Sequence, residues 1–197
     1  MGKVIAIVGN TGAGKTTLVR ALCRQAAFAC GLEQHAERPF QALFNNDRRY
    51  ALANQLDYLL WRAKQEYGLR QSDPDLLLDG GLDLDFHGFT RLFLARGFLT
   101  EAEFNLCADL YGFCRSILPL PELIIHLIVD RQTLLQRLAG RDRINIATSA
   151  DLDLLDSFIR EWLTTLAPGK VFSIEVSGDD QHFSRTVPVV LDKISRL

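Results

Sequence analysis

The sequence predicts an α/β fold, in which a five-stranded parallel sheet carries helices on both faces. Three observations indicate this class. Short apolar runs alternate with longer helix-like stretches along the chain, as in folds built from repeated strand–helix units. The run at 123–129 is apolar except for His126, which is typical of a strand buried on both faces. The 197 residues are 48% hydrophobic, and no linker or internal repeat divides them, so we expect one domain spanning 1–197.

The expected elements follow one another in strand–helix order. Strands are expected at the short apolar runs 4–8, 28–32, 76–79, 123–129 and 171–176. Helices are expected at 17–25, in a segment after the break at Pro39, and at 50–67, 86–96, 100–118, 131–141, 152–166 and 182–197. Thr100 and Glu103 have the spacing of a capping box, which marks a helix start.

The composition excludes several classes of protein. The net charge is −2 and the pI is about 6.1, so no overall basic field attracts nucleic acid polymers or anionic lipids. No apolar stretch approaches the ~20 residues that span a bilayer, and no signal-like leader precedes Val4. We therefore expect a cytoplasmic protein with no membrane and no nucleic acid partner.

The four cysteines form two pairs, each with a spacing of seven residues. Cys23 and Cys30 make one pair, and Cys107 and Cys114 make the other. Neither pair has the C-x-x-C spacing of common metal and redox sites. We expect all four to be small core residues, with no metal and no disulfide.

A glycine-rich loop between the first strand and the first helix carries the clearest chemical signal. Its glycines let successive backbone N–H groups curl around a polyphosphate, and the helix that follows adds a partial positive charge. Lys15 supplies a cation for the outer phosphates, and Thr16 is placed to bind Mg²⁺. A simple turn would have no use for this Lys-Thr pair. We expect ATP to contact Gly9, Asn10, Thr11, Gly12, Ala13, Gly14, Lys15, Thr16 and Thr17.

Further charged residues fall where ligands bind in parallel sheets, beyond the carboxyl ends of the strands. Asp79 directly follows the third expected strand and can hold Mg²⁺ opposite Thr16; the alternative is a helix N-cap. Arg137, Arg141 and Arg143 lie at the end of a helix and in the loop after it. These arginines can close over a transferring phosphoryl group, or they are a solvated basic helix end.

These motifs resemble one family, the deoxyribonucleoside kinases of the P-loop kinase group. The Gly9-Asn10 opening of the loop is similar to that family's version. Glu33 stands six residues before Pro39-Phe40, similar to the family's E-P-V-x-x-N-P-F segment. The resemblance implies that Glu33 is the general base. Glu37 is a local rival, and only the family spacing favours Glu33.

The resemblance continues through the middle of the chain and covers most of it. The stretch 50–62 is similar to the family's base-reading helix, 79–89 to its D-R-S block, and 137–143 to its lid. The segments 95–100 and 118–123 continue the likeness. The resemblance implies that the base is bound by Gln55, Arg62, Asp85 and Phe89. From the residues alone, Gln55 and Arg62 share a helix face, which is also common among solvated residues.

The resemblance implies a three-layer P-loop kinase fold with an arginine-bearing lid at about 137–150, and a homodimer built from long helices. It also implies ATP and Mg²⁺ as cofactors, with phosphorylation of the 5′-hydroxyl of a nucleoside or deoxynucleoside. Two other functions stay open. A nucleoside monophosphate kinase should present an extra arginine for the acceptor phosphate, and a regulatory nucleotide-binding module should show little turnover.

The chain departs from the family pattern at four positions. Gly80 stands where the family has an arginine beside the reacting groups, and Asn45 where a sugar-reading tyrosine is usual. Asn145 and Ile146 replace acidic residues of the lid. Relative to the family pattern, the residues expected to bind the base are therefore the same, whereas those expected to bind the sugar differ. This pattern fits a different sugar or a phosphorylated substrate, a rebuilt catalytic site, or a module that only binds nucleotides.

Overall fold

The computed structural model describes residues 2–32, 38–139 and 148–197. All strand pairs are parallel, in the order β2-β3-β1-β4-β5. The strands are β1 Val4–Gly9, β2 Ala29–Gly31, β3 Leu76–Asp79, β4 Leu123–Ile128 and β5 Val171–Glu175. The predicted five-stranded α/β fold is therefore confirmed.

The helices match the expected order, with small differences at their ends. They are α1 Lys15–Gln25, α2 Pro39–Asn46, α3 Ala51–Leu69, α4 Leu82–Leu84, α5 Arg91–Ala95, α6 Glu101–Ile117, α7 Arg131–Ala139, α8 Leu152–Thr164 and α9 Thr186–Ser195. Two short 3₁₀ turns, η1 Arg48–Tyr50 and η3 Ser149–Asp151, precede α3 and α8. The capping box of Thr100 and Glu103 is confirmed at the start of α6.

The predicted helix 86–96 is wrong in one respect. Asp85–Thr90 forms the π-helix η2, which joins α4 to α5 without a break. A π-helix has one more residue per hydrogen-bonded turn than an α-helix and is frequent at functional sites. Its apolar pattern looks like that of an ordinary helix, so the sequence did not distinguish the two.

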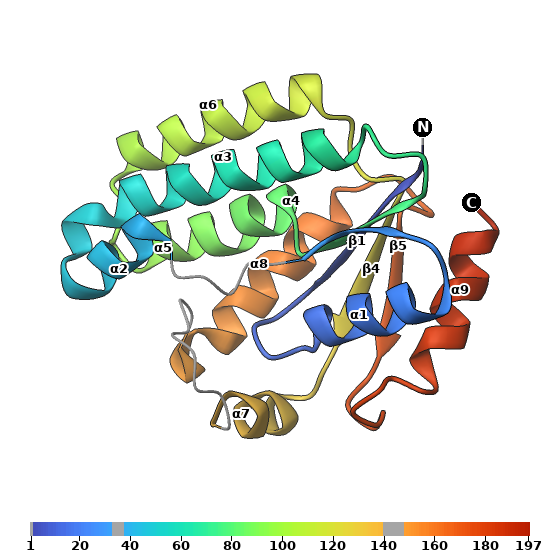
Figure 1. The fold of residues 1–197 in the computed structure, drawn as a ribbon. Coiled ribbons are helices and arrows are strands. Elements are labelled where there is room, and N and C mark those ends of the chain that lie inside the picture. Colours follow the sequence, from blue (N-terminus) through green and yellow to red (C-terminus); the bar gives the residue numbers. More distant parts are fainter. Residues whose placement is uncertain (1, 33–37, 140–147) are drawn as a thin grey trace.

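The helices cover the sheet in layers (Figure 1). On one face, α1, α7 and α9 pack over the side chains of Ile5 and Ile7. On the other face, η2, α5 and α8 pack over Val4 and Ala6. The helices α3 and α6 lie side by side beyond that second layer, and a third cluster fills the space between them, α2 and η2. No helix within the described ranges combines the length and the hydropathy needed to cross a bilayer.

The register of the sheet brings three loops to one edge. In β1, Ile7 pairs with Asp79 of β3, and Gly9 pairs with Leu127 of β4. The loop after β1 and the acid that ends β3 are therefore neighbours. Because Gly31 of β2 pairs with Leu78, the chain also leaves β2 next to Asp79. This edge is where a parallel sheet binds ligands.

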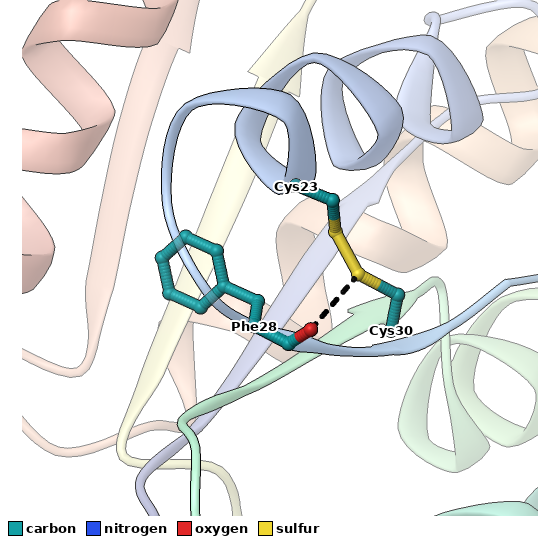
Figure 2. The surroundings of a disulfide bond; sticks show 3 residues. All are labelled: Cys23, Phe28 and Cys30. Atoms are coloured by element: carbon teal, nitrogen blue, oxygen red, sulfur yellow. Dashed lines mark hydrogen bonds between the residues drawn. A yellow bond between two sulfur atoms is a disulfide. The ribbon is translucent and has the colours of Figure 1, made fainter.

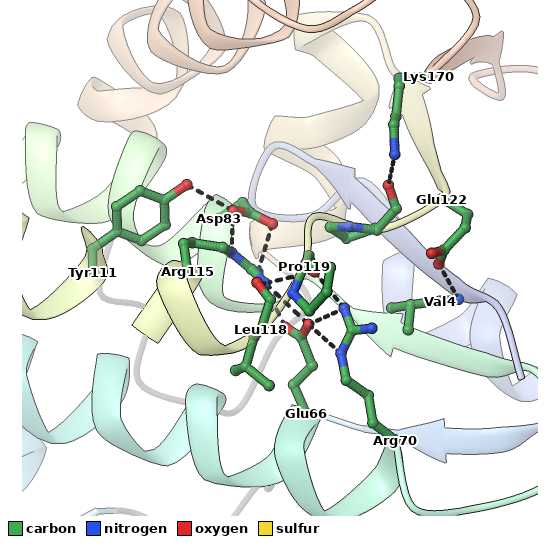
Figure 3. Close-up of polar contacts among 11 residues, drawn as sticks. Val4, Glu66, Arg70, Asp83, Tyr111, Arg115, Leu118, Pro119, Glu122 and Lys170 are labelled. Atoms are coloured by element: carbon green, nitrogen blue, oxygen red, sulfur yellow. Dashed lines mark hydrogen bonds and ion pairs between the residues drawn. The ribbon is translucent and has the colours of Figure 1, made fainter. Parts of the chain in front are cut away.

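A buried charge network holds the block after β3 against α3 and α6 (Figure 3). Arg115 of α6 donates to both oxygens of Asp83 at 2.8 Å and to Glu66 of α3 at 3.0 and 3.1 Å. Tyr111 and Arg70 complete the network through Asp83 and Glu66. Burial disfavours the charged guanidinium, but Asp83 and Glu66 raise the pKa of Arg115 above its usual value. The paired charges thus fix α4, which directly follows the Asp79 turn.

The prediction that all cysteines are unpaired is wrong for Cys23 and Cys30, which form a disulfide (Figure 2). Cys23 lies in the last turn of α1 and Cys30 lies in β2. The few residues between these elements turn the chain back, so the two side chains meet. Cys107 and Cys114 are buried free thiols, as expected.

Removing the disulfide should destabilise the protein without abolishing the fold. The bond closes a short loop, with a sequence separation of seven residues, and we expect Cys23→Ser/Cys30→Ser to lose roughly 2 kcal/mol of stability. Thermal melting with and without a reducing agent measures this. Reductant should lower the Tm of the parent and leave the double variant unchanged. A parent whose Tm does not respond to reductant would contradict the disulfide.

Candidate functional site

The loop between β1 and α1 has the backbone shape that its glycines predict. Gly9, Gly12 and Gly14 have φ angles of 150°, 85° and 97°, a region that other residues rarely adopt. A Cβ atom would lie 2.8 Å from the main-chain oxygen of Leu127 at Gly9, and 2.7 Å from the ring of Phe183 at Gly14. The loop therefore requires glycine at these positions, and α1 starts directly after it at Lys15. Backbone N–H groups at such a helix start are suited to a polyphosphate.

Two cations from different elements meet at this loop. Lys15 Nζ donates to the main-chain oxygens of Gly9 at 3.0 Å and Asn10 at 2.9 Å. Arg137 of α7 donates to the main-chain oxygen of Ala13 at 3.1 Å. Arg141 and Arg143, the other two predicted lid arginines, lie outside the described residues. Lys15 and Arg137 can both neutralise a phosphate bound by the loop.

The polar side chains of the loop have different surroundings. Asn10 is buried; its Nδ2 donates to the main-chain oxygen of Leu152 at 2.8 Å, and its Oδ1 accepts from the N–H of Thr11. Asn10 thus ties the loop to the start of α8. Thr17 is exposed on the first turn of α1.

Thr16 and Asp79, the predicted ligands of Mg²⁺, are hydrogen-bonded to each other. Thr16 Oγ1 donates to Asp79 Oδ2 at 2.5 Å, and Asp79 is fully buried at the end of β3. Hydroxyl and carboxylate oxygens fit Mg²⁺, which usually takes one or two protein ligands together with phosphate oxygens and waters. Within the described part of the chain, no group of three or more His, Cys, Asp or Glu residues could hold a metal. The donors present thus suit a metal ion that arrives with a nucleotide.

The turn after Asp79 has a backbone that disfavours an arginine at Gly80. Gly80 and Gly81 have φ angles of 81° and 91°, so two successive residues adopt the left-handed region that favours glycine. A Cβ at Gly80 would lie 3.3 Å from Leu84 Cδ2 and 3.6 Å from Arg62 Nη2. An arginine at this position would therefore be strained and would start beside another guanidinium.

Gln55, Arg62 and Asp85 come together inside the protein. The exposed fractions of Gln55 and Arg62 are 2% and 4%, so neither is the solvated helix residue that the sequence left open. Arg62 Nε donates to Asp85 Oδ2 at 2.7 Å. Phe89 lies one turn after Asp85 and packs, half-buried, against the core over the sheet. These four residues are the predicted base-binding set.

The π-helix brings in a residue that the sequence analysis missed. Thr90 is fully buried, and its Oγ1 donates to Gln55 Oε1 at 3.0 Å. The same hydroxyl lies 3.1 Å from the main-chain oxygen of Asp85. Thr90 therefore links the amide of Gln55 to the helix that carries Asp85. The contact joins residues 35 positions apart, and no local pattern predicts it.

An uncharged histidine anchors the other side of η2. Burial, with Arg91 and Arg115 nearby, lowers the pKa of His87 to about 4. Its ring stacks on Trp162, and Nε2 lies 3.1 Å from the hydroxyl oxygen of Tyr111. Since that hydroxyl donates to Asp83, His87 donates to Tyr111. His87 therefore stays neutral at pH 7, and its own titration does not affect η2 at that pH.

Other predicted positions fall outside the described residues or away from this cluster. Glu33, Glu37, Asn145 and Ile146 lie outside the described residues. Near them in sequence, the main-chain oxygen of Leu32 accepts a hydrogen bond from Gln65 Nε2 at 2.8 Å. Asn45 is exposed on α2.

Comparisons with known proteins point to one family. The family model for deoxynucleoside kinases matches residues 5–196. The chain is 23% identical over 143 residues to the deoxyadenosine/deoxycytidine kinase of Bacillus subtilis. It is 27% identical over 143 residues to the deoxyadenosine kinase of Dictyostelium discoideum. These matches cover 71% and 72% of this chain but only 66% and 58% of the two relatives, so it spans less than two thirds of either.

Solved structures share the fold. A deoxyadenosine kinase from M. mycoides with the products dCMP and dCDP bound has a TM-score of 0.81 and 19% identity, covering 98% of this chain and 100% of that chain. The same enzyme with bound dATP has a TM-score of 0.80 and 19% identity, covering 98% and 99%. At this level of identity the likeness establishes the fold.

Proposed function

The chain belongs to the deoxynucleoside kinase family, and on that premise we propose that it transfers the γ-phosphoryl group of ATP to the 5′-hydroxyl of a deoxynucleoside. The relative positions of the phosphate loop and the base-binding residues support this proposal independently of the family match. The phosphate loop with Lys15 follows β1, and the Asp79–Asp85 block follows its sheet neighbour β3 and reaches the buried pair of Gln55 and Arg62. A phosphate donor and a base can therefore be held near each other by rigid elements.

The residues suggest how the reaction would be assisted. The loop N–H groups and Lys15 would bind the outer phosphates of ATP, and Thr16 and Asp79 would hold the oxygen shell of Mg²⁺. When bound, Mg²⁺ neutralises charge on the phosphates. Glu33 would accept the proton of the attacking hydroxyl, as a general base does. Arg137, with Arg141 and Arg143, would stabilise negative charge on the transferring group.

The base-binding set suggests which nucleosides are accepted. Adenine and cytosine each carry an amino donor next to a ring-nitrogen acceptor. The carboxamide of Gln55 offers a matching acceptor and donor, and the carboxylate of Asp85 can accept from an amino group. Two relatives are named for deoxyadenosine, one of them also for deoxycytidine. We therefore propose deoxyadenosine and deoxycytidine as the substrates.

An acceptor panel tests this function against its rivals. ADP formation from Mg-ATP would be measured with deoxyadenosine, deoxycytidine, thymidine, the corresponding monophosphates, and no acceptor. The proposal expects ADP with deoxyadenosine or deoxycytidine. ADP with monophosphates alone would indicate a nucleoside monophosphate kinase. Background ADP with every acceptor would indicate a regulatory nucleotide-binding module.

We also propose that the protein is a homodimer built through α3 and α6. The helices α3 and α6 lie side by side (Figure 1). Their exposed large apolar residues are Leu60, Tyr67, Leu106, Phe113 and Ile117. Large exposed apolar patches are typical of protein–protein interaction sites. A second copy of the chain would cover these residues.

Sedimentation velocity tests the dimer. The parent should sediment as a dimer, and Phe113→Glu should sediment as a monomer, because Phe113 is 65% exposed on α6 and a charge there cannot be buried without a partner. Val189→Glu on α9 is the matched control, since Val189 is also exposed, and it should stay dimeric. A monomeric parent would contradict the dimer.

We further propose that residues 1–197 act as a single domain in the cytoplasm, where ATP and Mg²⁺ are available. Disulfides are rare in that compartment. The thiol state of Cys23 and Cys30 in cells, measured by alkylation before lysis, therefore tests the location independently of activity. Reduced thiols in cells would support the cytoplasmic location, with the Cys23–Cys30 bond forming only on oxidation. A disulfide already present in cells would contradict that location.

A further inference from the structure

The hydroxyl of Thr90 has a single hydrogen and two oxygen atoms within hydrogen-bond distance. Gln55 Oε1 of α3 lies 3.0 Å from Thr90 Oγ1, and the main-chain oxygen of Asp85 lies 3.1 Å from it. In a π-helix, the main-chain oxygen of a residue accepts the N–H of the fifth residue after it, so the oxygen of Asp85 has a partner within η2. Gln55 Oε1 is therefore the acceptor that depends on the hydroxyl.

The two polar atoms of the Gln55 carboxamide have different surroundings. Oε1 faces η2 and accepts the hydrogen bond of Thr90. Nε2 has no hydrogen-bond partner among the described residues, and it does not belong to the fully buried side-chain atoms that lack one. Nε2 is therefore in contact with solvent, and it is the atom of Gln55 that a ligand can reach.

Thr90 controls which end of the amide is left for the ligand. Its own exposed fraction is 0%, so it acts through Gln55 and does not touch the ligand itself. An amide oxygen accepts hydrogen bonds, whereas an amide nitrogen only donates them. Because the hydroxyl donates to Oε1, the donating end of the carboxamide is left for the ligand.

A donor at this place distinguishes amino-bearing bases from keto-bearing ones. Next to their amino group, adenine and cytosine carry a ring nitrogen that accepts a hydrogen bond. Next to their keto group, hypoxanthine and uracil carry a ring N–H that donates one. A donating Nε2 matches the first kind of base and meets a second donor in the other kind. Polar groups that are left unpaired in a binding site cause strong discrimination between substrates.

We propose that Thr90 is a positioning residue that sets the base specificity through Gln55: its hydroxyl holds Oε1 toward η2, so that Nε2 donates to the base. This inference rests on the proposed function and extends it, because it assigns the preference for amino-bearing bases to a residue that does not contact the substrate. Without the hydroxyl, the carboxamide is free to turn over. Oε1 then faces the ligand and accepts the ring N–H of a keto-bearing base.

Thr90→Val and Thr90→Ser separate this role from a structural one. Valine has a similar shape but no hydroxyl, whereas serine keeps the hydroxyl. The measurement is kcat/KM for two matched pairs, deoxycytidine with deoxyuridine and deoxyadenosine with deoxyinosine, whose members differ only at the base edge. The parent should prefer the amino-bearing member of each pair. Thr90→Val should lower this preference about tenfold, as expected for the loss of one hydrogen bond, and Thr90→Ser should keep it.

Thr164→Val is the matched control. Thr164 is exposed on α8, and its hydroxyl donates to the main-chain oxygen of Glu161, so this variant should keep the parent's preference. A folded Thr90→Val protein with an unchanged preference would overturn the inference, as would a parent that does not prefer the amino-bearing bases. An equal loss of kcat/KM for all four nucleosides in Thr90→Val would also overturn it, because a purely structural role affects both kinds of base alike.

NMR spectroscopy of the parent measures the orientation of the amide directly, even if Thr90→Val fails to fold. The side-chain NH₂ signals of Gln55 are assigned by their loss in Gln55→Met. The hydroxyl hydrogen of Thr90 is assigned by its nuclear Overhauser effect to the methyl group of the same residue. The inference expects at most a weak effect between this hydrogen and the NH₂ group of Gln55. A strong effect between them would place Nε2 against Thr90 and would overturn the inference.

Failure of this inference can be distinguished from failure of the proposed function. A parent that phosphorylates no nucleoside would contradict the proposed function, and the NMR measurement would still decide between the two orientations of the amide. A parent that phosphorylates deoxyadenosine or deoxycytidine, together with a Thr90→Val protein that keeps the parent's preference, would contradict this inference alone.

Discussion

Lys15→Ala is expected to lower ATP-dependent turnover by roughly 10²–10³-fold, because it removes a cation from the place where negative charge develops. In the structure, Lys15 Nζ lies over the loop, within hydrogen-bond distance of the main-chain oxygens of Gly9 and Asn10. The side chain is half-buried at the start of α1, so its truncation leaves no cavity in the core. Steady-state kinetics and a thermal melt measure the two effects separately.

The matched control is Lys64→Ala, which removes an exposed lysine from α3. It should keep the parent's turnover and ATP affinity. Lys15→Ala with unchanged turnover and unchanged ATP affinity would contradict the assignment of the phosphate loop and every role derived from it.

Glu33→Gln is expected to reduce turnover by roughly 10²-fold or more, as for the loss of a general base. Glutamine keeps the shape of the side chain but cannot accept the proton of the 5′-hydroxyl. ATP binding should change little, because the predicted phosphate ligands lie in the loop after β1. Single-turnover kinetics with saturating ATP and deoxynucleoside isolate the chemical step.

Glu37, four residues after Glu33, provides the matched control for the substitution. Glu37→Gln should leave the chemical step unchanged if Glu33 is the base. Full activity in Glu33→Gln together with a large loss in Glu37→Gln would assign the base to Glu37.

The features that local sequence determines were predicted well. An apolar run, a loop with glycines at fixed positions and a helix predict β1, the phosphate loop and α1, because the chemistry of that unit lies within about 20 consecutive residues. The left-handed φ angles of Gly12 and Gly14 follow directly from the residue type. Asp79 was placed opposite Thr16 because it directly follows a strand, and ligands bind beyond the carboxyl ends of the strands in parallel sheets.

The features that depend on tertiary contacts were not predicted. The disulfide of Cys23 and Cys30 needs the edge strand β2 to run back past the end of α1, which the spacing of the cysteines does not reveal. The contact between Thr90 and Gln55 joins the π-helix η2 to α3 across 35 residues of sequence.

The most direct test of the account follows the labelled phosphoryl group itself. The protein would be incubated with Mg-ATP labelled at the γ-phosphate and with deoxyadenosine, and the products would be separated by chromatography. The account predicts that the label appears in deoxyadenosine 5′-monophosphate, in amounts equal to the ADP formed, and that the Lys15→Ala variant forms almost none. Label that stays in ATP, or that appears only in inorganic phosphate, with deoxyadenosine and with deoxycytidine alike, would contradict the assignment of this chain as a deoxynucleoside kinase.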